Sequence, residues 1–334
     1  MSQSLRIAIV ILNWNGAGLL RKFLPSVVNY SPDAEIWVAD NASTDDSVAV
    51  LKSEFPSVKI VVNNKNYGFA GGYNEALKSI DADVYALVNS DIEVTNGWLD
   101  SVRSRFESNL ETGIIQPKIL DYKNKGLFEY AGAAGGFIDK FGYPFCRGRL
   151  FDTLEKDEGQ YNDDHTIFWA SGACFFIRKT IFDNLGGFDE DFFAHQEEID
   201  LCWRAFNSGH EAFYISQSTV YHLGGATLNE GHPRKTYLNF RNSLLMLAKN
   251  LPSKRLIPVI FIRLCLDGIA AIRFLFQGKI RHFFEVAHAH FGFYKRLPST
   301  LVKRKNSQYD SYFAVKNLIF SYFIQGKKRF TDLF

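Results

Sequence analysis

Residues 84–91 have the sequence VYALVNSD, in which a run of β-favouring residues is followed by three polar ones. A short apolar run that ends in polar residues is typical of a buried β-strand. Similar runs occur at residues 7–12, 35–39 and 58–62, with amphipathic, helix-length stretches at residues 17–28 and 47–55. This alternation predicts parallel strands joined by crossover helices. We therefore expect an α/β fold with a doubly wound sheet.

Polar residues follow each of the four predicted strands. They are Asn13-Trp14-Asn15, Asp40-Asn41-Ala42-Ser43, Asn63-Asn64 and Asn89-Ser90-Asp91. In doubly wound sheets, ligands bind outside the carboxyl ends of the strands. The sequence therefore predicts one polar rim at that edge of the sheet.

The composition is that of a folded globular protein, with 46% hydrophobic residues, 22% charged residues and a net charge of +2. The weak net charge and the lack of an arginine-rich stripe argue against a nucleic-acid-binding protein. Four widely separated cysteines form no CxxC pair, which argues against a zinc knuckle or a disulfide framework and favours a reducing compartment. The first residues lack the features of a signal peptide, so we expect the protein in the cytoplasm.

The length of 334 residues suggests about two structural units. The strand and helix pattern continues without a linker to about residue 240. We therefore expect one α/β domain over residues 1–240 and a helical C-terminal region over residues 241–334.

Residues 256–276 are strongly apolar but contain Arg263, Asp267 and Arg273. Each charge would cost roughly 2.5–3.5 kcal/mol at the centre of a bilayer, which disfavours a membrane-spanning helix. Basic residues on both sides favour a helix that lies on an anionic membrane surface, at the cytoplasmic face of the plasma membrane. A buried core or dimer helix is an alternative of nearly equal weight.

A second group of acidic residues, Glu197, Glu198 and Asp200, opens a predicted helix. Glu197 and Glu198 point about 100° apart on a helix, whereas Glu197 and Asp200 share a side. Asp200 and Arg204 have the spacing of an ion pair. The nearby aromatic residues are Phe192, Phe193 and Trp203. They suggest a partly buried setting in which the pKa of a carboxylate rises, while a solvated helix face is the plain alternative.

Five sequence blocks occur together in one order. They are VILNWNG at 10–16, DNASTD at 40–45, NYGFAGGYN at 66–74, LVNSD at 87–91, and residues 188–204. With these blocks the chain resembles the family 2 glycosyltransferases, and most of all their bacterial rhamnosyltransferase-like branch. The resemblance implies a mixed sheet of the nucleotide-diphospho-sugar transferase type, with a helical C-terminal extension. It also implies inverting transfer of a sugar from a dTDP or UDP donor to a glycan or lipid-linked glycan acceptor in cell-surface polysaccharide synthesis, with rhamnose as the leading candidate.

The resemblance assigns donor binding to the rim and to a glycine-rich loop. The residues are Asn13, Asn15, Asp40, Asn41, Asn66, Gly68, Gly71, Asn74, Asn89, Ser90 and Asp91. Asp40 stands where related enzymes recognise the nucleotide base, although an Asx-turn or a helix cap also fits it, with Ser43 or Thr44 as the better cap candidates. The loop at Gly68 lets the backbone approach a ligand, or forms a plain tight turn.

The resemblance also implies a metal site and a general base. Asp91 ends a DxD-like triplet whose first position is Asn89, and Asp91 with His222 would hold Mn²⁺ or Mg²⁺ against the donor diphosphate. A solvated turn for Asp91 and a structural role for His222 are the alternatives. Glu198 takes the position of the general base, where related enzymes have Asp. The remaining residues of this group would line or support the acceptor site: Glu197, Asp200, Arg204, His195 and Trp203.

Other classes of site fit less well. The GxGxx match that begins at Gly16 lacks the final glycine of a dinucleotide-binding loop, because position 21 is Arg21. No GxxxxGK[ST] segment is present for a phosphate-binding loop of the kinase type. Because of Asn89 and Glu198, a catalytically silent, membrane-attached glycan-binding or scaffold protein with the same fold stays open as the alternative.

Overall fold

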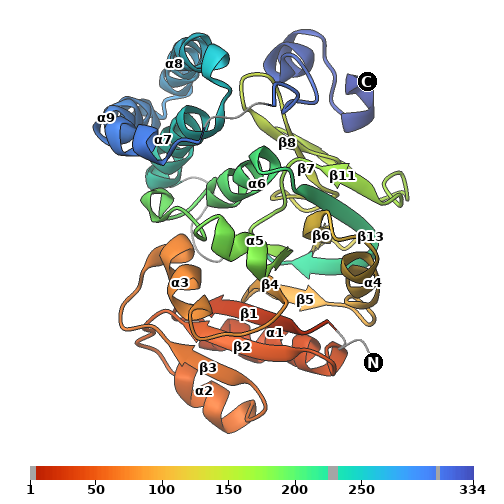
Figure 1. Ribbon diagram of the computed structural model, residues 1–334. Coiled ribbons are helices and arrows are strands. Elements are labelled where there is room, and N and C mark those ends of the chain that lie inside the picture. Colours follow the sequence, from red (N-terminus) through yellow and green to blue (C-terminus); the bar gives the residue numbers. More distant parts are fainter. Residues whose placement is uncertain (1–4, 225–231, 306–308) are drawn as a thin grey trace.

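The computed structural model describes residues 5–224, 232–305 and 309–334. Within them, a nine-stranded sheet has the strand order β11-β13-β6-β12-β4-β1-β2-β3, with β5 paired to β13 (Figure 1). Its strands are β1 (Ile7–Asn13), β2 (Glu35–Asp40), β3 (Lys59–Val62), β4 (Val84–Asn89), β5 (Ile92–Val94), β6 (Thr112–Asp121), β11 (His165–Ile167), β12 (Cys174–Arg178) and β13 (Glu211–His222). Strands β3, β2, β1 and β4 are parallel, whereas β12 is antiparallel to β4 and β6. The prediction of a mixed α/β sheet is confirmed.

Both faces of the sheet are buried. In β1, Ile7, Ile9 and Ile11 belong to one apolar core, while Ala8 and Val10 belong to the other. Helices α1 (Ala17–Tyr30), α2 (Ser47–Glu54) and α4 (Asp100–Ser108) contribute to the first core, and α3 (Gly68–Leu77), α5 (Lys179–Asn184) and α6 (Glu197–Asn207) to the second. A strand covered on both faces has a continuous apolar sequence, which is why residues 7–12 show no alternation. The predicted strands and helices of the first 90 residues are all present, with ends within two residues of those expected.

A smaller sheet contains β7 (Gly136–Ile138), β8 (Pro144–Cys146), β9 (Arg149–Leu150) and β10 (Thr153–Leu154). The last part of the chain returns to this sheet, with short helical turns at Phe320–Ile324 and Phe330–Leu333. Leu318 is buried against Phe145 and Leu150, and the ring of Phe330 lies 5.2 Å from that of Phe137. The C-terminus is therefore packed onto the α/β part of the chain.

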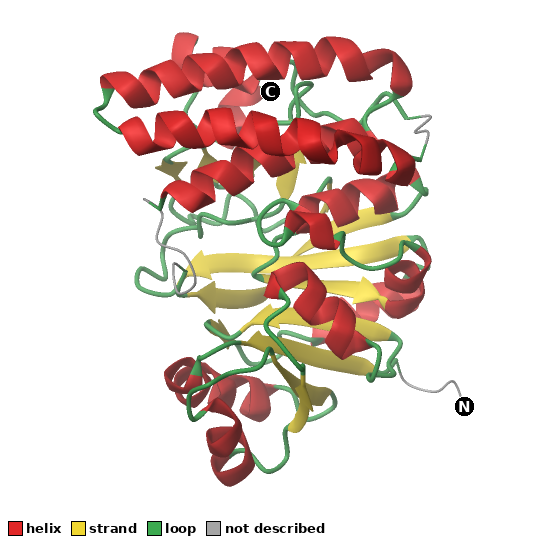
Figure 2. Ribbon diagram, turned by 90° about the vertical axis from the view of Figure 1, so that its left-hand side faces the viewer, coloured by secondary structure: helices red, strands yellow, loops and turns green. Residues whose placement is uncertain are grey.

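Three long helices complete the structure: α7 (Pro233–Asn250), α8 (Ser253–Phe276) and α9 (Ile280–Lys303). They lie together at the top of Figure 2, beyond the sheet. Leu244 and Leu245 of α7 belong to the same apolar core as Trp203 of α6. The helical C-terminal region is thus present, and its core is continuous with that of the α/β part; a division at residue 240 stays a prediction.

Helix α8 has an inverted distribution of polarity. Its buried positions are Val259, Arg263, Asp267 and Ala271, whereas Ile257 and Phe276 are 80% and 88% exposed. Arg263 lies 3.8 Å from Asp267 and donates to the carbonyl of Phe141, so the two charges have partners inside the protein. In the described part of the chain, no helix combines the length and the apolar character that crossing a membrane requires.

Candidate active site

The polar rim forms where β1 and β2 end side by side, with Asn13 paired in register to Asp40. The Asn13 amide donates to Asp40 Oδ1 at 3.0 Å, and the Ser43 N–H donates to Asp40 Oδ2 at 2.9 Å. Asp40 is buried, and the second contact is the Asx-turn that the sequence offered as an alternative. The carboxylate therefore shapes the loop after β2, whatever else it contacts.

The other end of this loop is fixed by Asn15 and by Asp45. Asn15 accepts from the Thr44 N–H at 2.7 Å, while its own N–H donates to Ser43 Oγ at 2.8 Å. The expectation that Ser43 or Thr44 caps α2 is wrong, because Asp46 occupies the N-cap position without a side-chain cap hydrogen bond, and Asp45 Oδ1 accepts from the Ser47 N–H at 3.0 Å. A carboxylate one residue closer to the helix reaches that donor directly.

Asn41 joins the rim to the glycine-rich loop. Its side chain donates to Asn66 Oδ1 at 3.0 Å and to the Gly68 carbonyl at 2.9 Å, and it accepts from the Tyr67 N–H at 3.2 Å. Gly68 has φ +74°, and a Cβ there would lie 2.8 Å from the Phe193 ring. The position therefore requires glycine for both its backbone conformation and its space.

Helix α3, which follows, is tied to the segment that leads to the acidic helix. Asn74 exchanges hydrogen bonds with the backbone of Phe188 at 2.9 Å in both directions and donates to Glu190 Oε1 at 3.1 Å. A Cβ at Gly71 would lie 3.5 Å from the Glu190 carboxyl carbon. Asn74 thus holds the two halves of the site together, and Gly71 lets them approach closely.

Asp91 and His222 meet because β5 and β13 pair antiparallel, with Ile92 opposite His222. His222 Nε2 lies 3.2 Å from Asp91 Oδ1, and Nδ1 lies 3.1 Å from Glu129 Oε1. All three side chains are buried. Burial opposes protonation of the imidazole, but the two carboxylates outweigh it and raise the pKa of His222 to about 10. Glu129 was missed from the sequence, since it lies on a loop outside any motif.

This pair also bears on metal binding. A carboxylate oxygen suits Mn²⁺ or Mg²⁺, whereas an imidazole nitrogen beside it suits Mn²⁺ better than Mg²⁺. Across residues 5–224, 232–305 and 309–334, no group of three or more His, Cys, Asp or Glu side chains is arranged to hold a metal ion. The assignment of Asp91 and His222 as metal ligands stays a prediction.

The segment before α6 has a strained backbone. Phe193, His195 and Gln196 all have positive φ, at +63°, +70° and +74°. Each such residue costs on the order of 1–3 kcal/mol, so surrounding contacts must hold the segment in place. Asn242 of α7 supplies them by donating to the carbonyls of Phe192, Ala194 and His195 at 2.7–3.0 Å. Its neighbour Arg241 donates to the carbonyls of Asp191 and Phe192.

The strained segment leads directly into α6, and Glu197 and Glu198 lie in the first turn of that helix. A Cβ at Gly172 would lie 3.7 Å from Cβ and Cγ of Glu198, and the adjacent Ala173 carbonyl accepts from the Asn89 N–H at 2.9 Å. Glu198 therefore lies beside the strand end that carries Asn89 and Asp91. Burial raises the pKa of Glu198 to about 7, and burial together with Glu198 raises the pKa of Glu197. Such a carboxyl can exchange a proton near neutral pH.

The other residues of the acidic group have structural positions. Asp200 is fully buried and contacts Arg204 at 2.8 Å, Lys249 at 2.9 Å and Asn250 at 2.8 Å. The expected Asp200–Arg204 ion pair is present, and a solvated helix face is excluded for Asp200. Trp203 is buried between Phe168 and Tyr312, so it supports α6 from the core. Burial lowers the pKa of His195 to about 4, which leaves its imidazole neutral.

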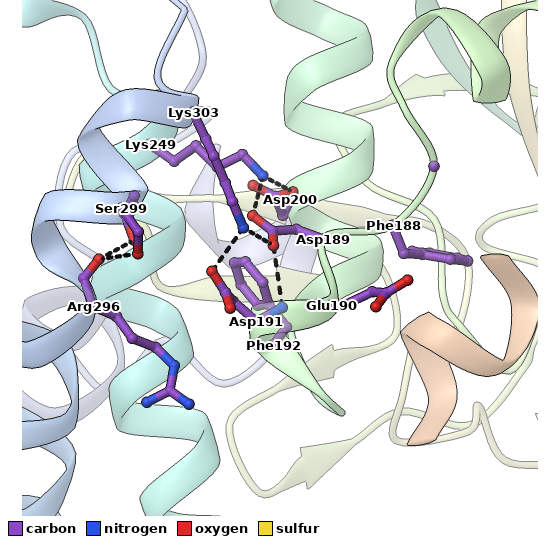
Figure 3. Close-up of polar contacts among 12 residues, drawn as sticks. Phe188, Asp189, Glu190, Asp191, Phe192, Asp200, Lys249, Arg296, Ser299 and Lys303 are labelled. Carbon is purple, nitrogen blue, oxygen red and sulfur yellow. Dashed lines mark hydrogen bonds and ion pairs between the residues drawn. The ribbon is translucent and has the colours of Figure 1, made fainter. Parts of the chain in front are cut away.

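Two lysines of the C-terminal helices complete an ion-pair cluster around the strained segment (Figure 3). Lys249 contacts Asp189 at 2.7 Å in addition to Asp200. Lys303 contacts Asp189 at 2.6 Å and Asp191 at 2.7 Å. Sequence reasoning missed both lysines, because they lie 49 to 114 residues from their partners.

Comparison with known proteins agrees with this arrangement. Residues 8–186, just over half of the chain, match the family described as Glycosyl transferase family 2. The chain is 24% identical to an N-acetylglucosaminyl-diphospho-decaprenol L-rhamnosyltransferase of Mycobacterium tuberculosis, over 65% of this chain and 75% of that protein. It is also 24% identical to the low-salt glycan biosynthesis hexosyltransferase Agl10 of Haloferax volcanii, over 86% and 89% respectively.

The fold has solved counterparts as well. A crystal structure of GalNAc-T7 with UDP, GalNAc and Mn²⁺ superposes with a TM-score of 0.56 at 16% identity. The match covers 74% of this chain and 48% of the GalNAc-T7 chain, so it shows the A-type glycosyltransferase fold alone. The silent scaffold alternative gains no support from these relatives. The chain belongs to glycosyl transferase family 2 and is a glycosyltransferase of glycan biosynthesis.

Proposed function

We propose that the protein is an inverting, metal-dependent transferase in which Glu198 is the general base. The carrying observation is the position of Glu198, a half-buried carboxyl with a pKa of about 7 that lies next to the strand end bearing Asp91. The donor is a nucleoside diphosphate sugar of the dTDP or UDP type, bound along the rim from Asn13 to Asp91. Rhamnose is the leading sugar, as in the name of the mycobacterial relative.

The proposed reaction is a direct displacement. Glu198 takes the proton from an acceptor hydroxyl as its oxygen attacks the anomeric carbon, and the bond to the nucleoside diphosphate breaks on the opposite face. Asp91 and His222 would hold a divalent cation, which would neutralise the charge that develops on the leaving diphosphate. The strained segment pinned by Asn242 fixes the start of α6 and thus the place of Glu198.

We further propose that the enzyme works at an anionic membrane surface on a lipid-linked acceptor. The inverted polarity of α8 supports this: Arg263 and Asp267 are buried, whereas Ile257, Phe261 and Phe276 are exposed. An exposed apolar face flanked by basic residues is the pattern of an interfacial helix.

The donor and metal assignments can be tested together by thermal shift. The protein is screened with UDP, dTDP, GDP and CMP and their sugar conjugates, each with Mn²⁺, Mg²⁺ or EDTA, since a ligand that binds only the native state raises its stability. We expect one pyrimidine nucleoside diphosphate to stabilise the protein in the presence of metal. Asp91→Asn should abolish the metal-dependent part, whereas the exposed Asp152→Asn control should keep it. A shift that is equal in EDTA would contradict the metal assignment.

A further inference from the structure

A basic groove of about 600 Å³ lies between α7 and α9. It is lined by Arg234, Tyr237, Glu285, His288, Phe291, Gly292, Lys295 and Arg296. Three cations, Arg234, Lys295 and Arg296, thus face a groove that contains one carboxylate. None of the three forms an ion pair within the described residues, and in Figure 3 the Arg296 guanidinium points away from the acidic cluster around Lys303. Unneutralised cations around a concave site are suited to an anionic group.

The groove borders the active site. The Arg234 guanidinium lies 5.5 Å from the centre of the Phe193 ring, and the Phe193 carbonyl accepts from the Phe69 N–H at 3.1 Å. On the same wall, formed by α7, the Tyr237 hydroxyl lies 3.4 Å from Arg241, which donates to the carbonyls of Asp191 and Phe192. The groove therefore shares its walls with the segment that places Glu198.

The groove also leads to an apolar surface. Phe291 forms part of its wall and is 74% exposed, and Phe284, two turns earlier on α9, is 53% exposed. Residues seven apart lie on one face of a helix, so these rings form a stripe that leaves the groove. An anionic site that continues into an apolar stripe matches a molecule with a charged head and a hydrocarbon tail.

We infer that this groove binds the diphosphate of a polyprenyl-diphosphate-linked acceptor, with the chain leaving along Phe291 and Phe284. The inference rests on the proposed transfer to a lipid-linked acceptor and names the part of the acceptor that is held. Arginine binds phosphate oxygens through two donors in one plane, and a lysine supplies a further charge. With the diphosphate held here, the first sugar of the acceptor lies toward Phe193 and Glu198. Anionic bilayer lipids carry the same phosphate chemistry, so the test must separate the two sources.

The probe is farnesyl diphosphate, titrated calorimetrically into the full-length protein with and without a saturating nucleoside diphosphate and Mn²⁺. The groove variant is Arg234→Gln/Lys295→Gln/Arg296→Gln. The control variant, Lys52→Gln/Lys123→Gln/Lys156→Gln, removes the same charge from exposed positions outside the groove and away from α8. We expect the groove variant to bind farnesyl diphosphate at least about 100-fold more weakly and the control less than about threefold, because each charge-assisted contact is worth about tenfold or more. Farnesol, which lacks the diphosphate, should bind the unmodified protein and both variants equally.

Phosphatidylglycerol vesicles distinguish the second source. If the inference holds, both variants lose vesicle binding to a similar, small extent. Selective loss of vesicle binding in the groove variant would make the groove a general anionic-lipid site and overturn the inference. Equal weakening of farnesyl diphosphate binding in both variants, or no binding to the unmodified protein, would also overturn it. Nucleotide binding is measured separately. A lack of nucleotide binding would contradict the proposed function, whereas the farnesyl diphosphate titration alone tests the groove.

Discussion

Replacing Lys249 by methionine should destabilise the protein strongly, because Lys249 neutralises two buried carboxylates at once. Its ammonium lies 2.7 Å from Asp189 and 2.9 Å from Asp200, and all three side chains are at most 7% exposed. Removing one partner of a buried ion pair typically costs about 3–5 kcal/mol. Asp200 keeps Arg204 and Asn250, and Asp189 keeps Lys303, so we expect the lower end, about 3 kcal/mol.

Urea unfolding followed by tryptophan fluorescence measures this loss. Lys303→Met is the informative comparison, because Lys303 contacts the same cluster but its side chain is 40% exposed. An exposed ion pair contributes about 0–1 kcal/mol, so this variant should lose no more than that. Lys52→Met, at an exposed position of α2, is the neutral control. A loss below about 1 kcal/mol in Lys249→Met, or equal losses at positions 249 and 303, would refute the reasoning.

Three further predictions follow from the same contacts. Asn242→Ala removes three hydrogen bonds from the strained segment. We expect kcat to fall by about tenfold or more, while donor binding in the thermal-shift assay is kept. An unchanged kcat would mean that the segment keeps its conformation without Asn242. Gly68→Ala places a Cβ 2.8 Å from the Phe193 ring at a residue with φ +74°, so it should weaken donor binding and lower the melting temperature. The control is Gly18→Ala, whose Cβ would meet nothing within 4 Å and which should leave donor binding unchanged. In Asp189, burial is outweighed by Lys249 and Lys303, which lower its pKa to about 2. Its stabilising contribution is therefore complete above about pH 5 and is lost as the pH falls toward 2, by roughly 2 kcal/mol, and the pH dependence of urea unfolding should become shallower in Lys249→Met.

The first half of the fold could be predicted from sequence because its signals are local. The run at 84–88 is apolar throughout since both faces of β4 are buried, and the polar residues after each strand mark the point where the sheet ends. The Asp200–Arg204 pair was predictable for the same reason, as both residues lie on one helix. By contrast, β12 and β13 pair with strands far away in the sequence, and no short pattern specifies such partners.

The site was only partly accessible from sequence. Motifs gave Asp91, His222 and Glu198, which the structure brings to one end of the sheet, but their roles stay predictions. The partners that position them are long-range: Glu129 contacts His222 from a loop, and Asn242 reaches the strained segment from α7. Asp40 and Asn41 match a donor-binding motif, but the structure shows that their side chains also form hydrogen bonds that hold loops in place. A motif identifies such residues but does not separate the two tasks.

Sugar transfer by Glu198→Gln tests the central claim most directly. The unmodified protein, Glu198→Gln and Glu197→Gln are compared with the nucleotide sugar selected by thermal shift, and product formation is measured together with donor binding. The amide keeps the size of the side chain but cannot accept a proton, so Glu198→Gln should lose about 100-fold or more in kcat with donor binding intact. Glu197→Gln should keep more of its activity. Full activity in Glu198→Gln, or a larger kcat loss in Glu197→Gln with donor binding intact, would contradict the assignment of Glu198 as the base.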